Sequence, residues 1–144
     1  MCRFFCRSNS NDSFTIISIC CVIDALVNAV QNGKKVLAVV ELAARFDEEA
    51  NINWAQSLTE NGIQVLFGIP GLKVHSKLLL IERKEGNSAR YYSYVGTGNF
   101  NEKTARRYTD FGLMTHDQNM GKDVQGVFDF LQYTYKQPQY RLLM

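Results

Sequence analysis

The spacing of hydrophobic residues along the chain predicts three helices. Apolar side chains recur at helical intervals in residues 19–30 and 48–61, and each segment is followed by an Asn-Gly pair that ends in Gly33 or Gly62. Glycine is a common helix stop because it adopts the left-handed conformation without strain. Asp117 is the expected N-cap of a last amphipathic helix. Four apolar residues mark the buried face of that helix: Val124, Val127, Phe128 and Leu131.

Short apolar runs between the helical segments predict strands. Residues 36–42 are apolar at every position except Glu41, as in a strand that is covered on both faces. Residues 78–81 and 91–95 form a predicted strand pair, joined by a charged loop over residues 84–90. Two shorter strands and one turn complete the pattern: residues 64–67, 111–115 and 68–71. This alternation predicts one α/β layered domain with a mixed β-sheet flanked by helices.

The composition is that of a folded domain and argues against a nucleic-acid-binding protein. The chain has 144 residues, of which 46% are hydrophobic and 21% are charged, close to globular averages. Lys and Arg number 16 and Asp and Glu number 14, which gives a net charge of +2. Proteins that bind nucleic acid through many phosphate contacts carry a larger basic excess. We therefore expect no nucleic-acid partner, although a local anion site is compatible with this charge.

The amino-terminal part of the chain differs from the rest. All the cysteines lie there: Cys2, Cys6, Cys20 and Cys21. Their spacing matches neither a zinc site nor a disulfide framework, which predicts reduced thiols in a cytosolic protein. The apolar run in residues 14–30 is interrupted by Asp24 and Asn28 and is too short to span a bilayer, so no membrane insertion is expected. For the atypical residues 1–13 we expect no ordered structure.

His75 and Lys77 form the first candidate site, just before the strand predicted over residues 78–81. Strand side chains alternate between faces, so residues two apart point the same way and bring an imidazole beside an ammonium. A neutral ring nitrogen can attack phosphorus and form a phosphohistidine, while the cation neutralises a phosphoryl oxygen. The alternative is an exposed histidine beside a solvated lysine, and the spacing alone leaves both open.

A glycine-rich loop follows the strand predicted over residues 91–95. Gly96 and Gly98 let backbone N–H groups approach an anion closely. Three side chains add donors: Thr97, Asn99 and Asn101. The alternative is a tight strand-to-helix turn without a ligand. Whether the loop lies at the His75 end of the sheet depends on strand direction, which the sequence leaves open.

Four long blocks of the sequence stand out: VLAVVELAARFDEEAN over residues 36–51, GLKVHSK over 71–77, GTGNFNEKTAR over 96–106 and YTD over 108–110. Together and in this order they resemble the bacterial type-1 polyphosphate kinase family. The likeness extends from about Asp24 to Met144. It implies a phospholipase-D-like α/β domain, and it implies reversible transfer of the γ-phosphate of ATP to inorganic polyphosphate through a phosphohistidine.

The resemblance also implies roles for particular residues. His75 matches the histidine that becomes phosphorylated, Arg45 matches an arginine of the magnesium and phosphate site, and Tyr108 matches a tyrosine that contacts the nucleotide. Lys77 and Asn99 match the H-x-K and Gly-x-x-Asn pattern of phospholipase-D-like sites. The implied cofactor is Mg²⁺, and the implied partners are ATP and inorganic polyphosphate. For the full-length family we expect homo-oligomers in the cytoplasm, peripheral to the inner membrane. Without the resemblance, Arg45 would be taken for a solvated residue and Tyr108 for a core or rim aromatic.

The chain departs from the family pattern at both ends. An arginine of the family's site would align with Thr15, and the family continues past Met144 into a second phospholipase-D-like domain with a further histidine and arginine. We therefore expect residues 14–144 to be a partial catalytic domain with an incomplete site, without turnover at the rate of a complete enzyme. Two alternatives remain: a phospholipase-D-like phosphodiesterase or nuclease, and a non-catalytic phosphate-binding fragment.

Overall fold

The computed structural model describes residues 2–8, 19–40, 48–72, 74–100 and 105–143, with the backbone alone for residues 2–8, 19–21, 48–51, 53 and 54. Within these ranges a 6-stranded sheet has the order β3-β2-β1-β4-β5-β6. The strands are β1 Cys2–Ser8, β2 Lys35–Val40, β3 Gln64–Phe67, β4 Lys77–Glu85, β5 Ser88–Gly96 and β6 Gly112–Thr115. Parallel pairing joins β1 to β4 and β2 to β3, whereas the other neighbours are antiparallel, so the sheet is mixed.

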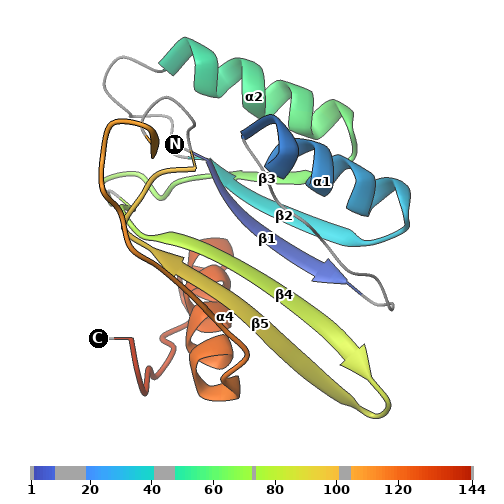
Figure 1. The fold of residues 1–144 in the computed structure, drawn as a ribbon, viewed down its shortest axis with the longest axis vertical. Coiled ribbons are helices and arrows are strands. Elements are labelled where there is room, and N and C mark those ends of the chain that lie inside the picture. The colour runs from blue at the N-terminus through green and yellow to red at the C-terminus, as the bar shows by residue number, and fades with distance from the viewer. Residues whose placement is uncertain (1, 9–18, 41–47, 73, 101–104, 144) are drawn as a thin grey trace.

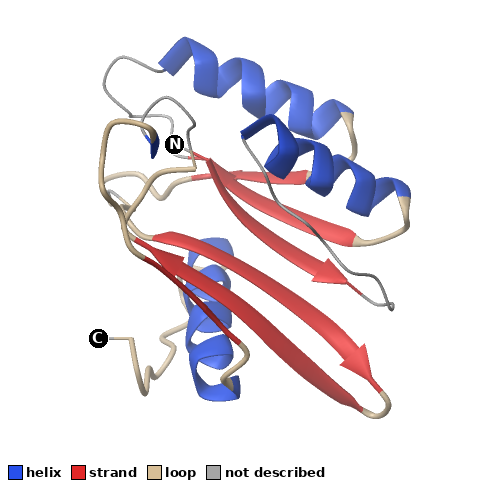
Figure 2. Cartoon of the chain, viewed as in Figure 1, coloured by secondary structure: helices blue, strands red, loops and turns tan. Residues whose placement is uncertain are grey.

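Helices cover both faces of this sheet (Figure 1; Figure 2). Helices α1 (Ile19–Gln31) and α2 (Glu48–Glu60) contact β1, β2 and β3 on one face. Helix α4 (Gln118–Gln132) packs on β4 and β5 from the opposite face. The predicted α/β layered architecture is therefore confirmed, and the helices leave one face of β4, β5 and β6 uncovered (Figure 1).

The buried residues of β2 contribute to two hydrophobic clusters, one on each face of the sheet. Val36, Ala38 and Val40 belong to the cluster beneath α1 and α2, and Leu37 and Val39 belong to the cluster beneath α4. Successive strand side chains point to opposite faces, so a continuous apolar run fills both clusters. The predicted strand with both faces covered is thus confirmed over the described residues of this segment.

The predicted helix ends are also confirmed. Gly33 follows α1 with a φ of 74°, and Gly62 follows α2 with a φ of 81°. Asp117 is the N-cap of α4, because its Oδ1 accepts the N–H groups of Asn119 and Met120 at 2.9 and 2.8 Å. The side chain thereby satisfies two of the backbone donors that the first turn of a helix leaves without an internal partner.

The hairpin between β4 and β5 is longer than predicted. The expectation of a charged loop over residues 84–90 is wrong, because both strands continue to a turn of two residues, Gly86 and Asn87. Gly86 has a φ of 60°, as the favoured hairpin turns require at their first central position. Charged side chains do not interrupt a strand whose face is solvated. Here they form ion pairs, with Arg83 Nε 3.8 Å from Glu85 Oε1 and Arg90 Nε 3.7 Å from Glu85 Oε2.

The expectation of no ordered structure near the amino end is wrong for Cys2–Ser8. These residues form β1, which pairs with both β2 and β4 in the interior of the sheet. Such pairing depends on backbone N–H and C=O groups that every residue except proline carries in full, so it does not require a familiar sequence. Residues 9–13 lie outside the described part of the chain.

Asp123 on α4 anchors the carboxy-terminal segment. It is 3% exposed, and its Oδ2 accepts the N–H groups of Arg141, Leu142 and Leu143 at 2.9, 2.6 and 3.0 Å. Burial raises the pKa of this carboxyl, but the three N–H donors and the charge of Arg141 together lower it by more, so the net pKa is below its ordinary value. The ionised carboxylate therefore holds residues 141–143 against the helix.

Replacing Asp123 with alanine should lower the free energy of unfolding by about 1–3 kcal/mol, because three N–H donors lose their acceptor. The partly exposed Asp129 on the same helix, whose Oδ2 lies 3.5 Å from Lys136 Nζ, is the control, and Asp129→Ala should cost about 0.5 kcal/mol or less. The native pKa of Asp123 is lowered, so its contribution is present above pH ~4 and is lost as the pH falls through the native pKa. Urea unfolding at pH 7 and pH 3 measures this. A difference between Asp123→Ala and wild type that is equally large at both pH values would contradict it.

Candidate functional site

Several strands begin or end at one edge of the sheet, which we call the site edge. Lys77 at the start of β4 pairs with Gly96 at the end of β5, and Gly96 pairs with Gly112 at the start of β6. The ends of β2 and β3 lie at the same edge, where Val40 pairs with Phe67. The glycine-rich loop after β5 therefore lies at the His75 end of the sheet, which resolves the point that strand direction left open.

The side chain of Lys77 reaches back from the start of β4 to His75. The lysine is 2% exposed, whereas His75 lies before the strand and is exposed. Lys77 Nζ donates to the backbone oxygen of His75 at 2.7 Å and lies 3.2 Å from both Nδ1 and Nε2 of the ring. The predicted contact between imidazole and ammonium is thus present in the structure.

The equal distances from Lys77 Nζ to the two ring nitrogens of His75 limit the geometry of the contact between the ammonium and the imidazole. The lone-pair directions of Nδ1 and Nε2 diverge, so one ammonium cannot lie along both of them. Both contacts are therefore off-axis, and the ammonium holds positive charge beside the ring without occupying either lone-pair direction. The exposed histidine therefore has a ring-nitrogen lone pair that the ammonium does not occupy, next to a cation that is fixed by burial.

The start of the glycine-rich loop is fastened to the chain that enters β6. Thr97 Oγ1 donates to Asp110 Oδ1 at 2.9 Å and accepts the N–H of Phe111 at 3.0 Å, while the Thr97 N–H donates to Phe111 O at 3.0 Å. A Cβ at Gly98 would lie 2.7 Å from the Asp110 carboxylate, so this position requires glycine. Thr97 was expected to donate to an anion, and its hydroxyl is instead engaged by Asp110. The sequence carried no signal for this pairing.

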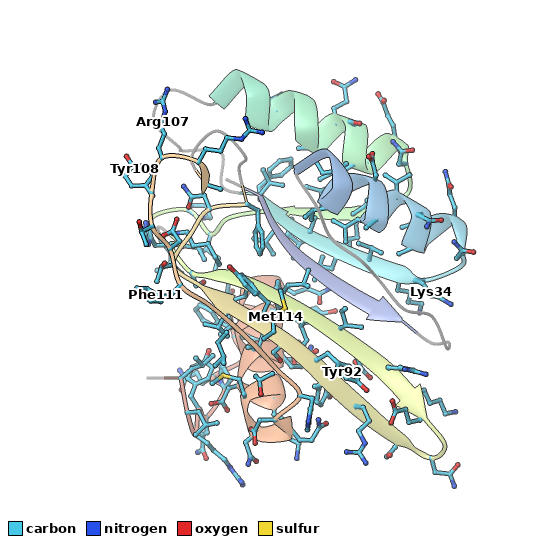
Figure 3. All side chains as sticks on the ribbon, in the orientation of Figure 1. Lys34, Tyr92, Arg107, Tyr108, Phe111 and Met114 are labelled. Carbon is cyan, nitrogen blue, oxygen red and sulfur yellow. The ribbon has the colours of Figure 1, made fainter. Side chains whose placement is uncertain are left out.

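Two of the remaining candidates, Asn99 and Tyr108, lie on the segment between β5 and β6. Asn99 is half-buried in the loop after β5, and Tyr108 is 68% exposed on the segment that leads to β6 (Figure 3). Tyr108 points to solvent and does not pack on His75. Arg45 lies outside the described residues. In the sequence it follows β2, whose last residue, Val40, lies at the site edge.

The described side chains show neither a metal centre nor a membrane span. In these parts of the chain, no group of three or more His, Cys, Asp or Glu residues could hold a metal ion. None of the helices found there is long and apolar enough to cross a membrane.

Comparison with known proteins gives concordant results. Residues 14–137 match the family described as polyphosphate kinase C-terminal domain 1. The polyphosphate kinases of Salmonella typhimurium and Escherichia coli K12 are each 54% identical to this chain over 123 residues, which are 85% of this chain and 18% of theirs. The crystal structure of polyphosphate kinase from Porphyromonas gingivalis is similar with a TM-score of 0.70 and 35% identity, covering 97% of this chain and 22% of that one. The chain thus spans less than a fifth of the length of these curated relatives.

Proposed function

The chain belongs to the polyphosphate kinase family, and from this premise we propose that its site edge transfers the γ-phosphate of ATP to inorganic polyphosphate through His75. The family and the layered fold expected from the sequence are confirmed, whereas the reaction and the site residues are our proposal. The observation that carries it is the buried Lys77 ammonium, which lies 3.2 Å from both ring nitrogens of the exposed His75.

In the proposed reaction, His75 is the nucleophile. A neutral ring nitrogen attacks the γ-phosphorus, a P–N bond forms, and the bond between phosphorus and the bridging oxygen breaks, so ADP leaves with that electron pair. In the second half, a terminal oxygen of polyphosphate attacks the phosphorus of phosphohistidine. A P–O bond forms, the P–N bond breaks, and the ring nitrogen regains its lone pair. Each step is reversible because each exchanges one phosphoryl bond for another.

Lys77 and the loop after β5 supply the electrostatic part of this proposal. The charge on a transferred phosphoryl group lies mainly on its non-bridging oxygens, and a preorganised cation stabilises that charge strongly in a partly dry site. Lys77 is held by burial and by the His75 carbonyl, so it needs little reorganisation. Asn99 would donate to phosphate oxygens from the fastened loop, Tyr108 would contact the nucleotide, and Arg45 would bind phosphate as the resemblance implies.

Magnesium, expected as the cofactor, has no ligand set among the described side chains. Asp110 is a carboxylate near the glycine-rich loop, and its Oδ1 already accepts the Thr97 hydroxyl. None of the described residues is therefore proposed as a ligand of the ion. In many phosphoryl-transfer sites Mg²⁺ is held largely by substrate phosphates and water. Homo-oligomerisation and a cytoplasmic location, peripheral to the inner membrane, stay predictions for the full-length family.

The purified chain, incubated with γ-labelled ATP and magnesium, should take up label that is stable in alkali and lost in acid, as expected of phosphohistidine. It should not elongate polyphosphate at the rate of a complete enzyme, because the groups of such a site act as a unit. Absence of protein-bound label would contradict the proposed role of His75. Hydrolysis of an aryl phosphodiester without ATP would instead favour a phospholipase-D-like phosphodiesterase, and ATP binding without covalent label would favour a non-catalytic module.

A further inference from the structure

Tyr94 lies on β5 two residues before the site edge. It pairs with Leu79 of β4 and with Met114 of β6. Its half-buried ring packs on Phe100, with centroids 5.5 Å apart and an angle of 46° between the rings. Both Phe100 and Leu79 pack against the cluster beneath α1 and α2, so Tyr94 projects from the face of the sheet on which those helices lie.

Two glycines make room for the phenol end of Tyr94. A Cβ at Gly96 would collide with the Tyr94 hydroxyl, and a Cβ at Gly112 would lie 2.6 Å from Cε2 and 2.8 Å from Oη of the same ring. Real Cβ atoms essentially never come within 3.0 Å of such neighbours. The ring therefore lies along the ends of two strands and directs its hydroxyl over the Gly96 backbone at the site edge.

This position brings the hydroxyl of Tyr94 to the strand position opposite Lys77, the residue that contacts His75. Gly96 is the direct partner of Lys77, and opposite residues of antiparallel strands project from the same face about 5 Å apart. Lys77, Gly96 and Gly112 form one row across β4, β5 and β6. Lys77 is the β4 member of this row, and the Tyr94 hydroxyl lies over Gly96, the β5 member. Among the described residues, no hydrogen bond joins Tyr94 Oη to the protein, and a phenol that makes none can donate one to a ligand.

We infer that the Tyr94 hydroxyl donates a hydrogen bond to the phosphoryl group that is transferred at His75, next to Lys77, so that Tyr94 is a further substrate-contacting residue. The ligand class is a phosphate anhydride, either an inorganic polyphosphate or the phosphate chain of a nucleotide. A phenol hydroxyl suits this place because it adds a donor to the anion without adding charge. Gly96 and Gly112 are then required by the ring that carries the donor.

Because this role rests on the proposed function, the test measures binding of two probes, inorganic tripolyphosphate and ATP, to the whole chain by calorimetry. Tyr94→Phe keeps the ring and removes only the hydroxyl. It should weaken binding about ten-fold, as expected for a lost hydrogen bond to a charged group, without changing the melting temperature. Tyr92→Phe is the matched control. Tyr92 lies two residues from Tyr94 on β5 and therefore projects from the same face, and its hydroxyl donates to Glu85 Oε1 at 3.0 Å, away from the site edge.

Each outcome decides the inference. Weaker binding of both probes to Tyr94→Phe, with Tyr92→Phe unchanged, supports a contact to the phosphate groups that the two ligands share. Weaker binding of one probe alone supports the contact and shows whether polyphosphate or the nucleotide makes it. Wild-type affinity in Tyr94→Phe, while Lys77→Met binds more weakly, overturns the role of Tyr94 and leaves the proposed function standing. A lower melting temperature together with weaker binding would assign the hydroxyl to folding and overturn the inference. No binding to the wild-type chain overturns both.

Discussion

Replacing His75 with alanine should reduce incorporation of γ-phosphate into the chain by about 10³-fold or more, because removal of a nucleophile removes the step itself. His75 is exposed and contacts Lys77 rather than the hydrophobic clusters, so the variant should fold as the wild type does. The measurement is acid-labile, alkali-stable label from γ-labelled ATP, with mass spectrometry to locate the phosphoryl group. Circular dichroism of both proteins checks the fold.

His116 is the matched control for this substitution. The chain has 2 histidines, and His116 is an exposed residue after β6, at the far end of that strand from Gly112 and the site edge. His116→Ala should therefore keep wild-type labelling. If His75→Ala retained label, or if His116→Ala lost it, His75 would not be the phosphoryl acceptor and the proposed mechanism would have to be abandoned.

Replacing Lys77 with methionine should slow phosphorylation of His75 by about 10²–10³-fold, the usual effect of removing one preorganised electrostatic group. The free energy of unfolding should stay within about 1 kcal/mol of wild type, because an apolar side chain of similar length replaces a buried charge that is costly to desolvate. Lys77→Met should thus lose activity without losing stability, as expected where a charge is retained for function. Single-turnover labelling and urea unfolding measure the two quantities.

Lys84→Met is the control, because Lys84 is an exposed lysine on the same strand near the hairpin turn, and neither quantity should change in it. Lys77→Arg should not restore the rate, since a planar guanidinium cannot take the place of a compact ammonium in the buried position beside the imidazole. A Lys77→Met chain that labels as fast as wild type would show that Lys77 only supports the local backbone, through its bond to the His75 carbonyl.

Local structure follows from short stretches of sequence in this protein. The end of α1 at Gly33 and the cap of α4 at Asp117 depend on residues within one turn, and both are predictable from the residue types alone. The two-sided burial of β2 likewise follows from its continuous apolar run. The length of the β4–β5 hairpin does not follow from local sequence, because charged residues near a turn fit a loop as well as a solvated strand. Only the pairing of the two strands distinguishes a loop from a strand here.

The placement of β1 shows what local sequence does not contain. Cys2–Ser8 lies between β2 and β4, and its partners are distant in the chain, so no window of neighbouring residues carries the information. In the candidate site, too, the sequence shows which residues are reactive but not how they are arranged. His75, Lys77 and the glycines are recognisable by their chemistry, but the alignment of Lys77, Gly96 and Gly112 in one row arises from strand register. The hydroxyl of Tyr94 reaches that row only because two glycines on different strands leave space for its ring. Residue type thus sets which groups can react, whereas long-range backbone pairing sets which of them meet.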